Sequence, residues 1–236
     1  MSHVFFEQMQ IPKPDYNLGI GNLTHGAMTG RMIEAIEQII LLERPDWVLV
    51  YGDTNSTLAG ALAAKKQHVK IAHVEAGLRS FNDMMPEETN RIITDRVSDL
   101  LFCPTAAAID NLKKEGYDNF NKKIIQCGDV MYDAALHFRD MSISPFIDKP
   151  EPSSFNLATL HRAENTDDKS SLLSIFSALV EISDNIPVVI PLHPRTRKML
   201  QEYNYDFSKS PLVFLEPVGY LQMLYLLKEC KMVLTD

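Results

Sequence analysis

Short runs of valine, isoleucine and leucine alternate with segments of helical periodicity along most of the chain, and this alternation most restricts the fold. Buried parallel strands are continuous apolar runs of this kind, and each pair of parallel strands needs a crossover, usually a helix. The pattern therefore predicts an α/β protein. We expect strands at 46–51, 69–74, 100–103, 123–127, 155–160, 187–192, 212–215 and 231–234. We expect helices at 26–43, 55–66, 86–98, 105–115, 131–139, 168–184, 195–203 and 219–229.

One stretch interrupts the alternation and marks a domain boundary. Residues 141–154, MSISPFIDKPEPSS, contain three prolines and follow neither a helical nor a strand period. We therefore predict two doubly wound, Rossmann-like domains, at 1–144 and 155–236, with a ligand pocket between them. The chain opens partway through the first pattern and stops at KMVLTD, a strand with no helix after it. Both domains are thus expected to be incomplete pieces of a longer protein.

The charge balance and the cysteines exclude several classes of protein. The net charge is −8, with no basic stripe, which argues against a nucleic-acid partner. The three cysteines, at 103, 127 and 230, are isolated in apolar runs and predict buried, reduced thiols of a cytoplasmic protein, without metal-ligand spacing. No apolar run reaches the roughly 18 residues of a membrane span, and no signal peptide is recognisable. We expect no membrane association.

Acidic residues end two of the predicted strands and begin the following helix. Asp53 closes WVLVYGD, although an Asp-Thr pair there could equally cap the next helix. Glu75 closes VKIAHVE, where an ionised carboxylate is costly unless it is paired. Arg79 is its nearest basic neighbour in sequence and is predicted to bind substrate. Glu87 lies in a conventional helix start after a proline, yet it is four residues before Arg91, so the two could form an ion pair directed at Glu75. Neighbouring carboxylates raise one another's proton affinity, which suits acid and base catalysis.

The second half places histidines and arginines at two strand-to-helix junctions. A lone histidine is usually structural, but these stand beside other polar groups, and arginines at a helix start oppose the helix dipole unless an anion is near. A bound diphosphate would be such an anion. The residues predicted to bind or act here are His161, Arg162, Glu164, Asn165, His193 and Arg195.

Six strings in sequence order together resemble the non-hydrolysing UDP-N-acetylglucosamine 2-epimerase family. Each string is weak evidence alone, but six in the same order over essentially the whole chain are highly specific. They are GDT at 52–54, HVEAGLRS at 73–80, MPEETNR at 85–91, CGDVMYDA at 127–134, HRAEN at 161–165 and HPRTRK at 193–198. The resemblance implies a glycosyltransferase-B-like fold and inversion of carbon 2 of a UDP-2-acetamido sugar, through elimination and re-addition of UDP.

By motif position, the resemblance makes Asp53, Glu75 and Glu87 the catalytic carboxylates, Arg91 a substrate contact and His161 the histidine near the diphosphate. It implies no cofactor and no metal, and a homodimer for the full-length protein. Which carboxylate moves which proton stays open. The phrases LRSFNDMMPEE and LHRAENTDD also resemble the branch that acts on UDP-2,3-diacetamido-2,3-dideoxy-glucuronic acid.

The sequence departs from the family at both ends. It lacks the Gly-Thr/Ala-Arg-Pro loop and the Gly-Gln-His segment near the start, and the Ser-Gly-Gly loop and glutamate beyond the counterpart of Asp236. These elements hold the nucleotide in the family, so we expect little or no epimerase activity from this polypeptide alone. A hydrolysing epimerase, a glycosyltransferase of the same architecture and an inactive fragment that binds a sugar nucleotide remain as alternatives.

Overall fold

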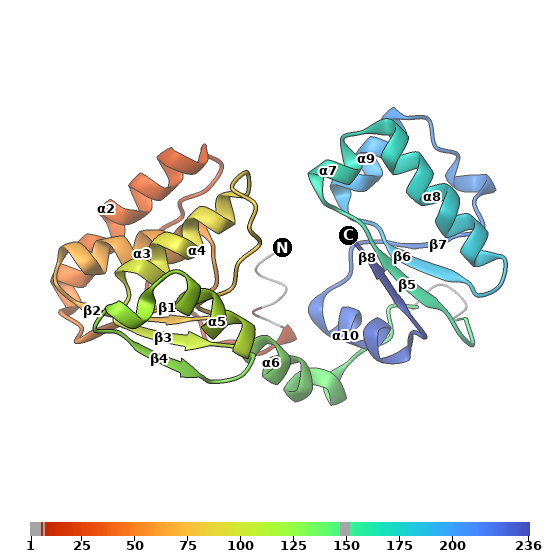
Figure 1. Cartoon of the computed structure of the whole chain (residues 1–236). Coiled ribbons are helices and arrows are strands. Elements are labelled where there is room, and N and C mark those ends of the chain that lie inside the picture. Colours follow the sequence, from red (N-terminus) through yellow and green to blue (C-terminus); the bar gives the residue numbers. More distant parts are fainter. Residues whose placement is uncertain (1–5, 7, 147–151) are drawn as a thin grey trace. The chain divides into compact units, whose positions relative to one another are not determined.

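The computed structural model describes residues 6, 8–146 and 152–236, which divide into two compact units. One unit is Pro14–Asp133, and the other is Ala134–Asp236 with the described residues before Pro14. The division falls within helix α6 (Val130–Phe138) (Figure 1). Part of the predicted linker, 147–151, lies outside the described residues, so the predicted boundary at 144–155 stays a prediction.

The Pro14–Asp133 unit is built on a four-stranded parallel sheet in the order β1-β2-β3-β4. Its strands are β1 (Trp47–Tyr51), β2 (Lys70–Val74), β3 (Leu100–Cys103) and β4 (Lys123–Gln126). Its helices are α2 (His25–Glu43), α3 (Asn55–Lys66), α4 (Pro86–Val97) and α5 (Ala106–Lys114). Because neighbouring strands are parallel, all four end at one edge, called here the carboxyl edge of the sheet.

Small residues bring α3 close to the first strand. Ala61, Ala63 and Ala64 are fully buried and pack in one cluster with Val50. A Cβ on Gly60 would lie 3.2 Å from Cγ1 of Val50, so no larger residue fits there without a shift. This packing fixes the start of α3, and with it the loop that carries Asp53.

The Ala134–Asp236 unit holds a second four-stranded parallel sheet in the order β7-β6-β5-β8. Its strands are β5 (Asn156–Thr159), β6 (Val188–Pro191), β7 (Val213–Leu215) and β8 (Val233–Thr235). Its helices after α6 are α7 (Ala163–Thr166), α8 (Lys169–Ser183), α9 (Pro194–Glu202) and α10 (Tyr220–Glu229). Both faces of this sheet are covered: Ala158 packs with Phe176 of α8, whereas Leu157 packs with Leu226 of α10.

The predicted α/β class and the two parallel sheets are therefore confirmed, and every predicted strand and helix is present. The prediction of three buried thiols is wrong for Cys127, which is exposed just beyond β4, whereas Cys103 is buried and Cys230 is half-buried.

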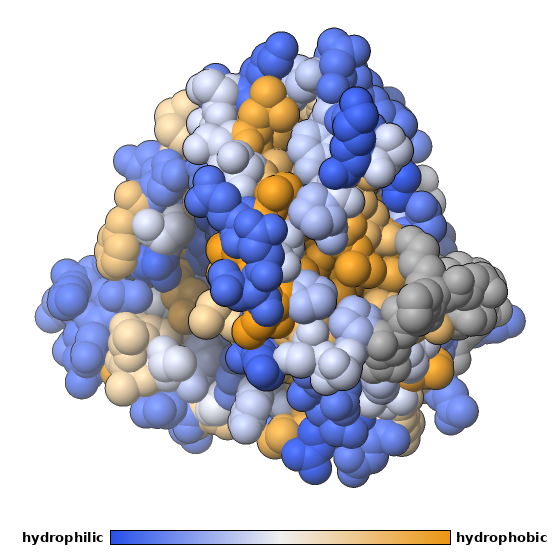
Figure 2. Space-filling view, turned by 90° about the vertical axis from the view of Figure 1, so that its right-hand side faces the viewer, coloured by the Kyte–Doolittle hydropathy of each residue, from blue (hydrophilic) through white to orange (hydrophobic). Residues whose placement is uncertain are grey.

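No helix of the described residues is long and apolar enough to cross a membrane. Hydrophobic residues are visible between hydrophilic ones on the face shown in Figure 2. Exposed hydrophobic residues in the Ala134–Asp236 unit include Leu227, Met232 and Val233.

Candidate functional site

Carboxylates gather at the carboxyl edge of the first sheet. Asp53 follows β1, Glu75 follows β2 and Asp129 comes shortly after β4. A Cβ on Gly52 would lie 3.4 Å from Oε2 of Glu75, so the Glu75 carboxylate lies against the loop that carries Asp53. Burial raises the pKa of Glu75 above its ordinary value, and the charges of Asp53 and Asp129 raise it further, against the opposing effect of Arg91. Glu75 thus holds a proton more readily than an isolated glutamate.

The backbone of Glu75 has an unusual conformation. Its φ is +76°, in the left-handed region that residues other than glycine rarely adopt. The N–H groups of Glu75 and Ala76 both donate to the carbonyl oxygen of Phe102, at 3.1 and 3.0 Å, and hold this conformation. Non-glycine residues in such regions cluster at functional sites, which makes the end of β2 a candidate site on geometry as well as charge.

Helix α4 brings a basic group to Asp53. Nη2 of Arg91 donates to Oδ2 of Asp53 at 2.5 Å, and the amide of Asn90 donates to the Asp53 carbonyl oxygen at 2.8 Å. The Arg91 side chain is 18% exposed, so it remains accessible to a ligand at this edge. The hydroxyl of Thr54, not the carboxylate of Asp53, caps α3 by accepting from the N–H of Thr57. The structure therefore brings Asp53, Glu75 and Arg91 together and leaves Asp53 outside the helix cap.

The predicted ion pair between Glu87 and Arg91 is wrong, because Glu88 takes that place. Nη1 of Arg91 donates to Oε2 of Glu88 at 3.0 Å, and Glu88 is buried. The N–H groups of Ser80 and Phe81 also donate to Glu88, which lowers the pKa of its carboxyl against the opposing effect of burial. Among the described residues the half-buried Glu87 side chain forms no hydrogen bond or ion pair, so the structure does not join it to the carboxylate pair.

Arg79, the basic residue nearest to Glu75 in sequence, is paired with other acids. Nη1 of Arg79 donates to Asp95 at 2.8 Å, while its Nε and Nη2 donate to Glu115 at 2.6 and 2.8 Å. Its side chain is 1% exposed, so a ligand cannot contact it in this conformation. Glu75 has a left-handed backbone conformation, and four residues later Arg79 is bonded to Glu115, the residue that caps the end of α5.

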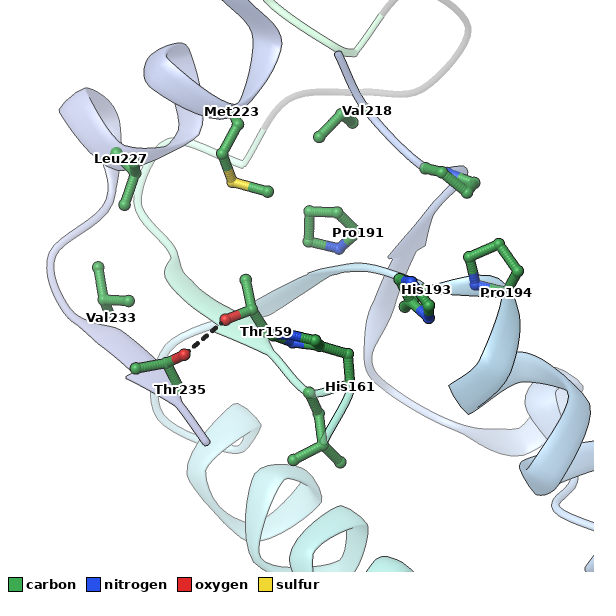
Figure 3. A pocket seen from close by; sticks show the side chains of 12 residues that line it. Thr159, His161, Pro191, His193, Pro194, Val218, Met223, Leu227, Val233 and Thr235 are labelled. Atoms are coloured by element: carbon green, nitrogen blue, oxygen red, sulfur yellow. Dashed lines mark hydrogen bonds between the residues drawn. The ribbon is translucent and has the colours of Figure 1, made fainter. Parts of the chain in front are cut away.

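The second unit places two histidines in the wall of a cavity of about 590 Å³ (Figure 3). The rings of His161, after β5, and His193, after β6, lie 5.8 Å apart between centroids. Both side chains are exposed to solvent, and Nδ1 of His161 lies 3.5 Å from the Asp236 carboxylate. The rest of the wall is mostly apolar. It includes Pro191, Pro194, Pro217, Val218, Met223, Leu227 and Val233.

The remaining predicted residues of this unit are paired within the protein. Asn165 donates to the Asp236 carboxylate at 3.3 Å, and Arg162 lies 3.8 Å from Glu164 on the surface. Nη2 of Arg195 donates to both carboxylate oxygens of Asp167, at 2.7 and 2.5 Å. The anion expected beside Arg195 is therefore supplied by the chain itself, and a bound diphosphate is not needed to explain that arginine.

Four polar residues of the first site were missed by the sequence reasoning: His73, Asn90, Asp95 and Asp129. Asp129 follows a strand in the same manner as Asp53 and Glu75, so the rule that identified those two would have found it. His73 and Asp95 carried no such signal, because His73 lies within a strand rather than at its end and Asp95 lies on a polar helix.

A family model described as UDP-N-acetylglucosamine 2-epimerase matches residues 1–236. The chain belongs to the UDP-N-acetylglucosamine 2-epimerase family. Among its relatives, the UDP-2,3-diacetamido-2,3-dideoxy-D-glucuronate 2-epimerase of Pseudomonas aeruginosa is 60% identical over 100% of this chain and 66% of its own length. The UDP-N-acetylglucosamine 2-epimerase of Methanococcus maripaludis is 44% identical over 100% of this chain and 67% of its own length.

Solved structures of the family confirm the fold. The UDP-GlcNAc 2-epimerase of Methanocaldococcus jannaschii, in complex with UDP-GlcNAc and UDP, matches with a TM-score of 0.85 and 43% identity, covering 100% of this chain and 67% of that one. The enzyme of Neisseria meningitidis, bound to UDP-GlcNAc, matches with a TM-score of 0.85 and 30% identity, covering 100% of this chain and 66% of that one. The chain thus spans about two thirds of the length of these relatives, in agreement with the prediction that it is an incomplete member.

Proposed function

We propose that this chain carries the acid–base half of a UDP-sugar 2-epimerase site, with Glu75 as one of the proton-transfer groups that act on opposite faces of carbon 2. In the proposed reaction a carboxylate removes the carbon 2 proton while the bond between carbon 1 and the UDP oxygen breaks, which leaves a glycal. A proton is then delivered to the opposite face of carbon 2, and UDP adds back to carbon 1. The substrate is a UDP-2-acetamido sugar, as the family predicts.

The raised proton affinity of Glu75 is the single observation that carries this assignment. An acid or base works best when its pKa lies near the working pH. Burial and the carboxylates of Asp53 and Asp129 raise the pKa of Glu75 in that direction. Arg91 pairs with Asp53 and remains partly exposed, which suits a contact with an anionic substrate. Glu87 is kept in the proposal by its motif position, as the second or third proton-transfer group.

We further propose that His161 and His193 contact the sugar nucleotide from the second unit. The cavity they line is apolar around two ring nitrogens, the composition typical of a small-molecule pocket. Arg162, Glu164, Asn165 and Arg195 are assigned a supporting role around this cavity, because their side chains already bind Asp236, Asp167 or one another.

The relative that is 60% identical favours a second candidate substrate. That protein is named for UDP-2,3-diacetamido-2,3-dideoxy-D-glucuronate, and the remaining relatives described above are named for UDP-N-acetylglucosamine at 43–44% or 30% identity. We therefore propose the diacetamido uronate as the alternative substrate. Both sugars carry the acetamido group and the hydrogen at carbon 2, so the same carboxylates serve either reaction.

Incubation in D₂O tests the function, because reprotonation places solvent deuterium at carbon 2. We expect slow deuterium incorporation at high protein concentration, detected by proton NMR of each sugar nucleotide, and little net epimerisation at catalytic concentrations. Glu75→Gln should abolish the exchange, whereas Asp110→Asn on the exposed surface of α5 should leave it unchanged. The proposal is overturned if neither sugar exchanges in the folded chain, or if Glu75→Gln exchanges as fast as the unmodified protein.

A cytoplasmic location and a homodimer of the full-length protein are also proposed. The cysteines of the described residues are free, which fits a reducing compartment. The dimer is proposed from the family resemblance, and light scattering on the eluting peak of a sizing column measures it directly.

A further inference from the structure

A buried histidine stands behind the carboxylate pair and has no part in the proposed chemistry. His73 lies on β2, two residues before Glu75, and is 0% exposed. Its Nδ1 is 2.7 Å from Oδ1 of Asp95, and its Nε2 is 2.8 Å from the carbonyl oxygen of Gly52. Asp95 is itself fully buried on α4.

Both ring nitrogens of His73 face acceptors, which determines where the protons are. A carbonyl oxygen can only accept, so Nε2 must donate to Gly52. Asp95 is held as a carboxylate, because its Oδ2 receives the N–H of Gly77 at 3.1 Å and Nη1 of Arg79 at 2.8 Å. Nδ1 must therefore donate to Asp95 as well. With hydrogens on both nitrogens, the ring is a positively charged imidazolium.

The surrounding charges alternate and make a buried cation tolerable. Asp95 lies between His73 and Arg79, and Arg79 is in turn paired with Glu115 at 2.6 Å. Buried ions are stable when each is paired and its remaining hydrogen-bonding atoms are satisfied, as they are here. The order imidazolium, carboxylate, guanidinium, carboxylate leaves the cluster with no net charge.

This cluster connects the backbone segments that carry the two reactive carboxylates. Gly52 immediately precedes Asp53, so the bond from Nε2 of His73 joins the end of β1 to the strand that leads into Glu75. The neighbouring backbone bond from Gly52 N–H to the Val74 carbonyl, at 3.0 Å, acts on the same two strand ends. The position of one carboxylate relative to the other therefore depends on the imidazole.

We propose that His73 is a positioning residue whose Nε2–H holds the Gly52 carbonyl oxygen and whose Nδ1–H holds Asp95, and that it thereby sets the separation of the Asp53 and Glu75 carboxylates. The purpose of that separation rests on the proposed function. The protonation and the geometry concern the chain alone and are tested without turnover.

Nitrogen NMR of the ¹⁵N-labelled chain tests the protonation. Ring N–H hydrogens of solvent-exposed imidazoles exchange rapidly with water, whereas buried, hydrogen-bonded ones exchange slowly. We expect one of the seven histidines to show two protonated ring nitrogens with slowly exchanging hydrogens. His68→Asn, at an exposed position with φ +59°, should keep that signal, whereas replacement of His73 should remove it. If a folded, unmodified chain shows no such signal, the proposal is wrong, and this measurement needs no variant to fold.

Carbon NMR of the Glu75 carboxyl tests the positioning. His73→Asn keeps a donor near the Nδ1 position, facing Asp95, and His73→Gln keeps one near the Nε2 position, facing Gly52. Both variants remove the positive charge of His73, which lowers the pKa of Glu75, so the two are compared with each other. We expect the Glu75 titration midpoint to be lower by about half a pH unit or more in His73→Asn than in His73→Gln, because the carboxylates of Asp53 and Glu75 move apart only in His73→Asn. Equal midpoints in His73→Asn and His73→Gln would contradict the inference, and the His68→Asn control should keep the original midpoint.

The two proposals fail in different ways. If neither sugar exchanges deuterium but the Glu75 midpoint responds to His73→Asn as expected, the proposed function is wrong and the positioning stands. If deuterium exchange occurs and depends on Glu75, but the Glu75 titration midpoint is the same in His73→Asn and His73→Gln, the function stands and the positioning role is wrong.

Discussion

Asp95→Asn is the substitution that most directly tests the buried network under the carboxylate site. Three donors converge on the two oxygens of Asp95: Nδ1 of His73 at 2.7 Å, the N–H of Gly77 at 3.1 Å and Nη1 of Arg79 at 2.8 Å. Asparagine has nearly the same shape but only one accepting oxygen. Its amide N–H₂ group would therefore face at least one of these donors in a site that is 0% exposed.

The cost follows from the contacts that are lost. A hydrogen bond to a charged group contributes about 1.5–3 kcal/mol, and removal of one partner from a buried ion pair costs about 3–5 kcal/mol. We expect the lower half of that range, because Arg79 keeps its hydrogen bonds to Glu115 and is not left unpaired. We predict that Asp95→Asn lowers the free energy of unfolding of the Pro14–Asp133 unit by about 3–4 kcal/mol.

Urea denaturation followed by tryptophan fluorescence measures this loss of unfolding free energy in the Pro14–Asp133 unit. Trp47 is the only tryptophan of the sequence and lies on β1, so its signal reports on the unit that contains Asp95. With a slope of about 2 kcal/mol per M of urea, the midpoint should fall by about 1.5–2 M. Asp110→Asn, an exposed change of the same chemistry, should shift the free energy by less than about 0.5 kcal/mol. If the two variants unfold at the same urea concentration, Asp95 is not the hub of a buried charge network.

Three further predictions use the same denaturation assay. Gly77→Ala should cost at least about 2 kcal/mol, because φ is +79° and the new Cβ would lie 2.5 Å from the Ala108 carbonyl oxygen. Gly128→Ala, with φ +89° but open space around it, should cost only about 1 kcal/mol, and a larger loss there would refute the steric explanation. Leu101→Ala, at a fully buried position, should cost about 2–5 kcal/mol, against under about 0.5 kcal/mol for Leu42→Ala at a 71% exposed one. Glu75 has a raised pKa in the folded state, so its contribution to stability is lost as pH rises through that pKa. The free energy of unfolding of Glu75→Gln should therefore rise relative to that of the unmodified protein between pH 4 and pH 7. A difference that does not change with pH would contradict this.

The strands and helices could be predicted because their signals are local. A parallel strand buried on both faces, such as β6, is a continuous apolar run whatever its neighbours are. Thr54 and Pro86 similarly mark the starts of α3 and α4 within a few residues of sequence. The short helix α7 was missed because four residues are too few to show a period.

Partners of charged side chains could be predicted only in part, because they depend on the turn between the elements. The spacing of Glu87 and Arg91 is compatible with an ion pair, yet Glu88, one residue later, is the one that the loop N–H groups of Ser80 and Phe81 pull into the core. Arg79 is the basic residue nearest to Glu75 in sequence, yet it donates to other acids. Its partner Glu115 lies 36 residues away, and no local pattern encodes that distance.

The two sheets offer different chemistry at their carboxyl edges, and this difference explains how the proposed reaction is divided. The first edge holds Glu75, whose pKa is raised, with Asp53 and Arg91 beside it, and these groups suit the proposed proton transfer. The second holds His161 and His193 in an apolar wall, and we propose that these groups bind the sugar nucleotide without taking part in proton transfer at carbon 2. An epimerase must both hold UDP while it is detached and invert a carbon centre. A chain with these two edges therefore has a separate place for each task, and Glu75→Gln should leave UDP binding intact while it removes deuterium exchange, a result that titration calorimetry with UDP can contradict.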